Sequence, residues 1–206
     1  MYEVELKVPA DHAAVRAVLR DAGVTPGPAR AQADTYYDAP HRDFAATDEA
    51  LRLRRTAPLE GEGDMAAIPS GRLGAVVETA VADATAAMTY KGPLVDDRSK
   101  SREELETDLS DGATAGAILD RLGFEAVATV AKLRSAVTVD EDTITLDRVA
   151  GLGSYVEVER EVETEAEVPA AREALIARLH ELGLAPGESI QTSYLELLLE
   201  ASDHPD

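Results

Sequence analysis

Acidic and basic side chains alternate with apolar ones almost at the start of the chain, in the segment Glu3-Val4-Glu5-Leu6-Lys7. Successive side chains of a β-strand point to opposite faces, so this segment would place Glu3, Glu5 and Lys7 on one face. A face with two acids and a lysine can hold both a metal ion and a phosphate group. The same pattern is also typical of an ordinary antiparallel strand with one solvated, polar face.

Charged residues at every second position recur along the chain, which favours a functional interpretation. The later segments contain Arg52 and Arg54, then Arg102, Glu104 and Glu106, then Lys132 and Arg134, and finally Glu157, Glu159 and Glu161. Like-spaced charges in so many strand-like segments suggest one shared, charged interior. Isolated buried charges cost several kcal/mol each, so such an interior requires water, a metal ion or an anionic ligand to satisfy them.

The elements that must position these charges follow from periodicity and turn residues. Strands are expected at residues 2–8, 32–38, 50–56, 88–92, 100–107, 124–139, 143–149 and 154–162, with 124–139 forming either one long strand or two. Helices are expected at residues 11–22, 112–122, 169–182 and 192–200. Asp11 is an N-cap candidate, Gly23 and Gly123 end the first two helices, and Gly151 and Gly153 form a turn between the last two strands.

About eight antiparallel strands with four helices fit a closed barrel, because closure removes unpaired strand edges. The charged residues would lie inside this barrel. The residues that would point outward beneath the helices are Val4, Leu6, Leu53, Val156 and Val158.

A chain of 206 residues is expected to form a single domain over 1–206. The acidic, Ala- and Gly-rich insertion at 58–87 is longer than connections normally are, and forms either a long hairpin excursion or a mobile flap.

The charge balance restricts the partners of the protein. Acids outnumber bases 40 to 20, which gives a formal net charge of −20 and opposes general binding to nucleic acid or to anionic membranes. An acidic, lysine-poor composition resembles that of proteins from salt-accumulating halophiles, which favours a haloarchaeal origin. No signal peptide or long apolar run is recognisable, so a cytoplasmic location is predicted.

Cysteine is absent from the chain, so thiolate metal sites and disulfides are excluded. The four histidines, His12, His41, His180 and His204, are scattered without the spacing of metal ligands. Carboxylate oxygens are therefore the natural ligands, and the expected cofactor is Mg²⁺ or Mn²⁺.

Several charged and aromatic segments together carry a resemblance to a known superfamily. They are Glu3-Val4-Glu5-Leu6-Lys7, Asp34-Thr35-Tyr36-Tyr37-Asp38, Leu51-Arg52-Leu53-Arg54-Arg55, Thr89-Tyr90-Lys91-Gly92-Pro93, Ser101-Arg102-Glu103-Glu104, Lys132-Leu133-Arg134, Asp147 with Gly151-Leu152-Gly153, Glu157-Val158-Glu159 and Ser193-Tyr194-Leu195-Glu196-Leu197-Leu198. Their order over nearly the whole chain resembles that of the CYTH superfamily of class IV adenylyl cyclases and thiamine triphosphatases, also called triphosphate tunnel metalloenzymes. The pieces around Lys91 and Tyr194 resemble the class IV adenylyl cyclase branch.

The resemblance implies a closed eight-stranded antiparallel β-barrel with flanking helices around a triphosphate tunnel. A triphosphate carries roughly four negative charges, which must be neutralised for binding and reaction. The bases expected to bind it are Arg52, Arg54, Lys91, Arg102, Lys132 and Arg134. The acids that the resemblance assigns to the metal are Glu3, Glu5, Asp147, Glu157 and Glu159.

Lys7 and Tyr36 are the candidate catalytic residues. In relatives that hydrolyse triphosphates, the lysine of the first motif, paired with the first tyrosine of the Asp-x-Tyr-Tyr-Asp run, is a proposed activator of water. Acidic neighbours should keep Lys7 protonated, however, and this favours a contact to phosphate over the role of a base.

The resemblance implies an enzyme that acts on a nucleoside, other organic or inorganic triphosphate. The favoured reaction is that of a class IV adenylyl cyclase, in which the 3′-hydroxyl of ATP attacks the α-phosphorus to give cyclic AMP and pyrophosphate. The alternatives are a thiamine or inorganic triphosphatase, in which water attacks the terminal phosphorus, and a non-catalytic binding protein for organic phosphates. The same residues serve all of these, so the sequence leaves the substrate open. It also leaves open whether the protein is a homodimer.

Overall fold

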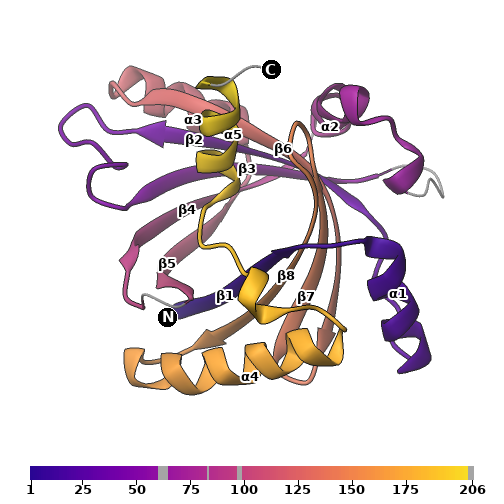
Figure 1. The fold of residues 1–206 in the computed structure, drawn as a ribbon. Helices are drawn as coiled ribbons and strands as arrows, with labels where there is room; N and C mark the ends of the chain where they lie inside the picture. The colour runs from indigo at the N-terminus through magenta and orange to yellow at the C-terminus, as the bar shows by residue number, and fades with distance from the viewer. Residues whose placement is uncertain (60–64, 83, 97–98, 204–206) are drawn as a thin grey trace.

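The computed structural model, which describes residues 1–59, 65–82, 84–96 and 99–203, contains a closed barrel of eight antiparallel strands (Figure 1). The strands are β1 (Tyr2–Pro9), β2 (Arg30–Asp38), β3 (Ala50–Pro58), β4 (Thr85–Leu94), β5 (Lys100–Leu109), β6 (Glu125–Val139), β7 (Asp142–Val149) and β8 (Gly153–Val162). Their order around the barrel is β1-β5-β4-β3-β2-β6-β7-β8, and β8 pairs with β1 to close it. The predicted fold class is confirmed, and β6 is one long strand.

Five helices accompany the barrel in the described chain: α1 (His12–Asp21), α2 (Leu73–Ala80), α3 (Gly112–Arg121), α4 (Val168–Glu181) and α5 (Tyr194–Asp203). The predicted cap of α1 is present, because the Asp11 carboxylate accepts a hydrogen bond from Ala13 N at 2.9 Å. Gly23 follows in the left-handed conformation with φ +76°, as a helix end of this kind requires. None of the helices in these residues is both long and apolar enough to cross a lipid bilayer.

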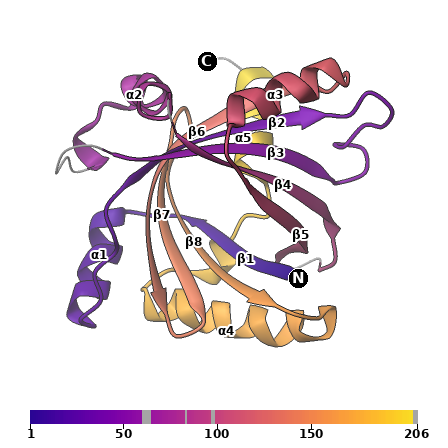
Figure 2. The same cartoon turned by 180° about the vertical axis from the view of Figure 1, so that it is seen from behind.

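The helices cover the outside of the barrel on opposite sides. Helix α4 runs along β1 and β8, whereas α2 and α3 lie on the other side, near β2, β3 and β6 (Figures 1 and 2). The core therefore lies between the helices and the outer face of the strands. Val4, Leu6, Val156 and Val158 are buried there with Leu175 of α4, which confirms their predicted outward orientation. Leu53 is buried in a second cluster with Leu119 of α3.

The connection between β3 and β4 is a packed cover in its described part. It contains short 3₁₀ turns at Met65–Ala67 and Ser70–Arg72, followed by α2. Leu73 and Val77 of α2 are buried in the main core, next to β2 and β6. Since β3 and β4 pair with each other, residues 65–82 belong to a long connection between two paired strands, and α2 within it packs on the core. Residues 60–64 and 83 of the predicted insertion lie outside the described residues.

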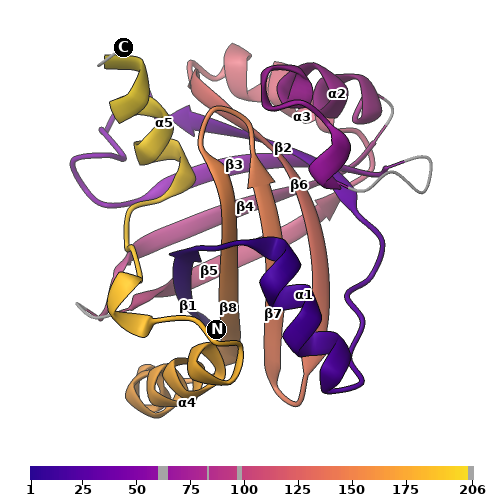
Figure 3. The same ribbon diagram turned by 45° about the vertical axis from the view of Figure 1, so that its right-hand side comes forward.

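Barrel closure brings the two ends of the chain together on the inner face. Strand β1 lies between β5 and β8, so that Glu5 stands opposite Lys100 on one side and Glu159 on the other. The C-terminal segment then passes beside β1 and leads into α5, which lies beside β6 (Figure 3). Charged residues that are far apart in the sequence thus face a common interior.

Candidate functional site

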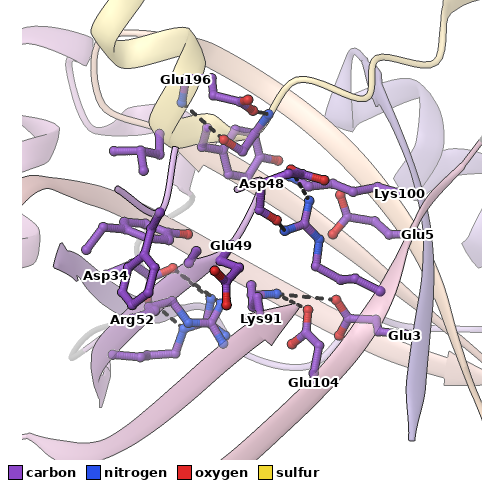
Figure 4. Close-up of a pocket in the computed structure, with 18 of the residues that line it drawn as sticks. Glu3, Glu5, Asp34, Asp48, Glu49, Arg52, Lys91, Lys100, Glu104 and Glu196 are labelled. Carbon is purple, nitrogen blue, oxygen red and sulfur yellow. Dashed lines mark hydrogen bonds and ion pairs between the residues drawn. The ribbon is translucent and has the colours of Figure 1, made fainter. Parts of the chain in front are cut away.

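The barrel encloses a cavity of about 550 Å³, to which both the strands and the start of α5 contribute (Figure 4). Every residue that the sequence analysis assigned to a site lines this cavity, except Asp147. Asp147 is fully buried behind the cavity wall. The strands thus bring the predicted residues into one place, but two groups of different character form within it.

Asp34 is the centre of the first group. Its carboxylate accepts two hydrogen bonds of 2.7 Å from Arg54 and lies 3.7 Å from Lys132 Nζ. Arg52 Nη1 approaches the same carboxylate to 4.0 Å. Burial opposes the charge of Asp34, but the field of Arg54 and Lys132 outweighs it and holds the pKa of this carboxyl well below its usual range.

Arg134 is the second centre of this group. It contacts the carboxylates of Asp147 and Glu157, and Lys132 Nζ lies 3.6 Å from Asp147 Oδ2. Burial disfavours the charge of Glu157, but Arg134 and Lys7 lower its pKa. Asp147 and Glu157 therefore act as counterions of bases. We call Asp34, Arg52, Arg54, Lys132, Arg134, Asp147 and Glu157 the paired side of the cavity.

Glu3, Glu5 and Glu159 form the opposite group. Each can offer one carboxylate oxygen such that the three oxygens lie within 4.8 Å of one another. Glu5 Oε1 is buried and, within the described residues, makes an ion pair of 3.4 Å with Lys7 Nζ but no hydrogen bond. Burial and the charge of Glu3 raise the pKa of Glu159 to about 8. A cluster of oxygen donors with too few cations fits a hard divalent ion such as Mg²⁺ or Mn²⁺.

Lys91 and Glu104 complete this second group. Lys91 Nζ contacts the Glu104 carboxylate and lies 3.6 Å from Glu3 Oε1 (Figure 4). Burial and the charge of Glu3 raise the pKa of Glu104 to about 7. We call Glu3, Glu5, Glu104 and Glu159 the acidic side. Lys91, which was predicted to bind phosphate, thus pairs with acids, although the charge of Arg52 on the neighbouring strand also acts on it.

Arg102 lies near the mouth of the cavity, where the loop before β3 holds it. Its guanidinium donates to the carbonyl of Asp48 at 3.2 Å and to the Asp48 carboxylate at 3.3 Å. Asp48 has a left-handed backbone with φ +53° and also accepts from Leu94 N at 2.8 Å. This predicted phosphate ligand is therefore held through contacts with a loop that the sequence analysis did not single out.

Lys7 and Tyr36 both retain their protons in this environment. Lys7 Nζ lies 3.4 Å from Glu5, 3.6 Å from Glu157 and 3.2 Å from the carbonyl of Thr192, to which it donates. Burial opposes its charge, but the two carboxylates raise the pKa of Lys7 above its ordinary value. Burial and the Asp34 carboxylate raise the pKa of the Tyr36 hydroxyl. Both shifts favour the protonated form, so both groups are suited to donate hydrogen bonds to phosphate.

Tyr194 connects α5 to the cavity. Its ring lies 4.3 Å from Lys7 Nζ and 5.3 Å from Lys132 Nζ, and packs edge to face against Tyr155. Ser193 caps the helix by accepting from Glu196 N at 3.1 Å. The predicted helix is confirmed, but its contact with two lysines of the interior was not foreseen.

Sequence analysis also missed Asp34 and Lys100 as members of the site. Both carried a usable signal, since Asp34 stands two residues before Tyr36 and Lys100 two residues before Arg102 in the same strands. Strand alternation alone places each on the inner face.

Comparison with known proteins gives the same family over nearly the whole chain. The model of the CYTH domain matches residues 1–194. A Methanocaldococcus jannaschii protein, provisionally named an adenylate cyclase, is 31% identical over 198 residues, which cover 96% of this chain and 98% of the relative.

Solved structures agree with this result. A protein from Pyrococcus horikoshii has a TM-score of 0.78 at 36% identity, with 96% of this chain and 98% of that chain covered. A Vibrio parahaemolyticus protein, also provisionally named an adenylate cyclase, has a TM-score of 0.74 at 23% identity, with 97% and 98% covered. The second likeness concerns the fold alone.

Proposed function

The chain belongs to the CYTH family, and we propose that it is a divalent-metal-dependent enzyme that converts ATP to cyclic AMP and pyrophosphate. The observation that carries this proposal is that one cavity contains a cluster of bases and, across from it, three carboxylates whose oxygens lie within 4.8 Å. A triphosphate with its metal ion needs both, because roughly four negative charges must be neutralised at once.

The bases of the paired side bind the phosphate groups in this proposal. Arg52, Arg54 and Arg134 provide planar forks for bidentate contacts, and Lys132 provides a point charge. Asp34 and Asp147 hold Arg54, Lys132 and Arg134 in place. The bases are therefore directed into the cavity before substrate arrives. A bound triphosphate shares or replaces their contacts with the two aspartates.

Glu3, Glu5 and Glu159 are the residues that we propose hold Mg²⁺ or Mn²⁺. When bound, the ion neutralises phosphate charge and polarises the bond to be broken. Asp147 and Glu157, which family resemblance also assigns to the metal, serve Arg134 as counterions in this arrangement.

The cyclase reaction is compatible with the protonated forms of Lys7 and Tyr36, because it needs no protein group to activate a water molecule. The ribose 3′-oxygen forms a bond to the α-phosphorus, the bond from that phosphorus to the bridging oxygen breaks, and pyrophosphate leaves; the hydroxyl proton passes to solvent or to pyrophosphate. Because the attack is intramolecular, no ordered water is needed. Lys7 and Tyr36, which keep their protons, hold phosphate oxygens as donors. The provisional name of the Methanocaldococcus jannaschii relative supports the same choice.

A product assay tests this function. ATP, thiamine triphosphate and tripolyphosphate are each incubated with the protein and Mg²⁺ or Mn²⁺ at high salt, and the products are separated by chromatography. We expect cyclic AMP and pyrophosphate from ATP, and inhibition by tripolyphosphate.

Two other results would replace the proposal. ADP and orthophosphate from ATP, or fast release of orthophosphate from thiamine triphosphate or tripolyphosphate without cyclic AMP, would identify a triphosphatase. Tight binding of a triphosphate without turnover would identify a phosphate-binding protein.

A further inference from the structure

The cations that line the cavity differ in whether a carboxylate neutralises them. The neutralised ones, each with a carboxylate oxygen no more than 4.0 Å away, are Lys7, Arg52, Arg54, Lys91, Arg102, Lys132 and Arg134. Lys100 also lines the cavity, but within the described ranges it makes no hydrogen bond and no ion pair. Its ammonium group is therefore available to an anion without the displacement of an internal partner.

Lys100 lies beside the acidic side of the cavity. It is the first residue of β5, stands opposite Glu5 of β1 in the sheet register, and appears next to Glu5 in Figure 4. Its other charged neighbours in the cavity are the cations Lys7, Lys91 and Arg102, and the acids Glu157 and Glu196, the latter at the start of α5. Burial and the field of Lys7 lower the pKa of Lys100 to about 8, which indicates that positive charge there is incompletely neutralised.

We propose that Lys100 is a further phosphate-contacting residue, which holds a phosphate group of the substrate next to the carboxylate of Glu5. The proposal rests on the proposed function, because it requires a triphosphate in the cavity. Each of the other bases must share or release a carboxylate when phosphate binds, and this reduces its net contribution to affinity. Lys100 loses no such partner, so its contact contributes to binding in full.

The position of Lys100 also explains why a cation is needed there. A phosphate group that approaches Glu3 and Glu5 is repelled by these carboxylates, and Lys91 is already shared between Glu3 and Glu104. An ammonium group on the neighbouring strand offsets the repulsion where phosphate and carboxylates meet. Lys100 thereby extends the phosphate-binding surface from the paired side to the acidic side.

Variants of Lys100 can separate this role from a structural one. Inorganic tripolyphosphate is titrated calorimetrically into the wild type, Lys100→Met, Lys100→Arg and the control Arg20→Met, in EDTA so that turnover does not interfere. Arg20 is exposed on α1, outside the barrel, so its variant removes the same charge without touching the cavity. We expect Lys100→Met to weaken binding about tenfold or more, Lys100→Arg to retain most of the affinity, and the control to change it less than about twofold.

Thermal unfolding of the same proteins without ligand completes the test. Lys100→Met should melt no lower than the wild type, because no internal contact is lost. Tripolyphosphate affinity equal to that of the wild type in Lys100→Met would refute the proposal, as would a lower melting temperature of this variant without ligand. In either case the proposed function stands if Arg54→Ala still loses affinity. If the wild type neither binds nor converts any triphosphate, the proposed function fails, and the role of Lys100 fails with it.

Discussion

The paired and acidic sides of the cavity both contain buried carboxylates, but these carboxylates differ in how they titrate. On the paired side, neighbouring bases lower the pKa of Asp34 and of Glu157 despite burial. On the acidic side, burial and neighbouring acids raise the pKa of Glu104 to about 7 and of Glu159 to about 8, whereas burial at Glu3 is outweighed by Lys91, which lowers the pKa of Glu3 to about 2. A carboxylate's place in the barrel therefore decides whether it already has a cation or still lacks one.

The number of cations within reach explains this difference. Arg54, Lys132 and Arg52 surround the single carboxylate of Asp34. Lys91, in contrast, is shared between Glu3 and Glu104. The charges of the paired side are thus compensated within the protein and contribute to the stability of the barrel. The acidic side has fewer cations within reach, which is why we propose that a divalent ion binds there.

Removal of the Asp34 charge should give the largest effect, and this effect should be a loss of stability. Asp34→Asn leaves Arg54 buried without a counterion and Lys132 with Asp147 alone, which should cost about 3 kcal/mol of unfolding free energy at pH 7. Because folding lowers the pKa of Asp34, its contribution is complete above the unfolded value of about 3.9 and is lost as the pH falls below it. The difference in melting temperature from the wild type should therefore be constant between about pH 7 and 5 and shrink below about pH 4.

Asp108→Asn is the matched control, because Asp108 is exposed on β5. Its melting temperature should stay close to that of the wild type. Equal stability of the Asp34 and Asp108 variants at neutral pH would contradict the view that the paired side is structural.

Removal of one acidic-side carboxylate should act on turnover and leave stability nearly unchanged. Glu159→Gln takes a ligand from the proposed metal site, and we expect metal-saturated turnover to fall about 100-fold, equivalent to about 2.7 kcal/mol of transition-state stabilisation. Turnover is measured against Mg²⁺ and Mn²⁺ concentration, with Glu163→Gln, at an exposed position directly after β8, as the control. A normal metal response with a near-normal rate would remove Glu159 from the site.

Arg54→Ala tests the opposite side of the comparison, and should mainly weaken binding of the triphosphate. We expect KM to rise about tenfold, because a charge-assisted bidentate contact is lost, while the response to metal concentration stays normal. Initial rates over a range of substrate and metal concentrations separate the two parameters. If Arg54→Ala shifted the metal response and left KM unchanged, the division of labour between the two sides would be wrong.

Strand alternation explains how much of this site could be predicted from sequence. Spacing of two placed Glu3, Glu5 and Lys7 on the inner face and Val4 and Leu6 on the outer face, and the structure agrees. The same rule holds for Arg52 and Arg54 of β3 and for Lys132 and Arg134 of β6, which all line the cavity. The side chains that share one face of a strand can thus be predicted without knowledge of the neighbouring strands.

Partners across strands could not be predicted in this way. Asp147 meets Arg134 because β6 and β7 pair in one register, and Asp34 meets Arg54 because of the register between β2 and β3. Spacing within one strand carries no information on register, so Asp147 could not be separated from the carboxylates of the acidic side. Helix α2 was missed for another reason, since its few large apolar residues lie within an Ala- and Gly-rich segment.

Salt should have the smallest effect and should distinguish the surface from the interior. A formal net charge of −20 destabilises the compact protein when screening is weak. Between about 0.1 M and 2 M potassium chloride the Debye length falls from about 10 Å to about 2 Å, so surface repulsion is largely screened and the melting temperature should rise by several degrees. Buried pairs are screened much less, so the wild type and Asp34→Asn should rise in parallel and keep their difference. An unchanged wild-type melting temperature would contradict the haloarchaeal origin that the composition predicts. A difference that vanishes at high salt would show that the paired side behaves as exposed surface charge.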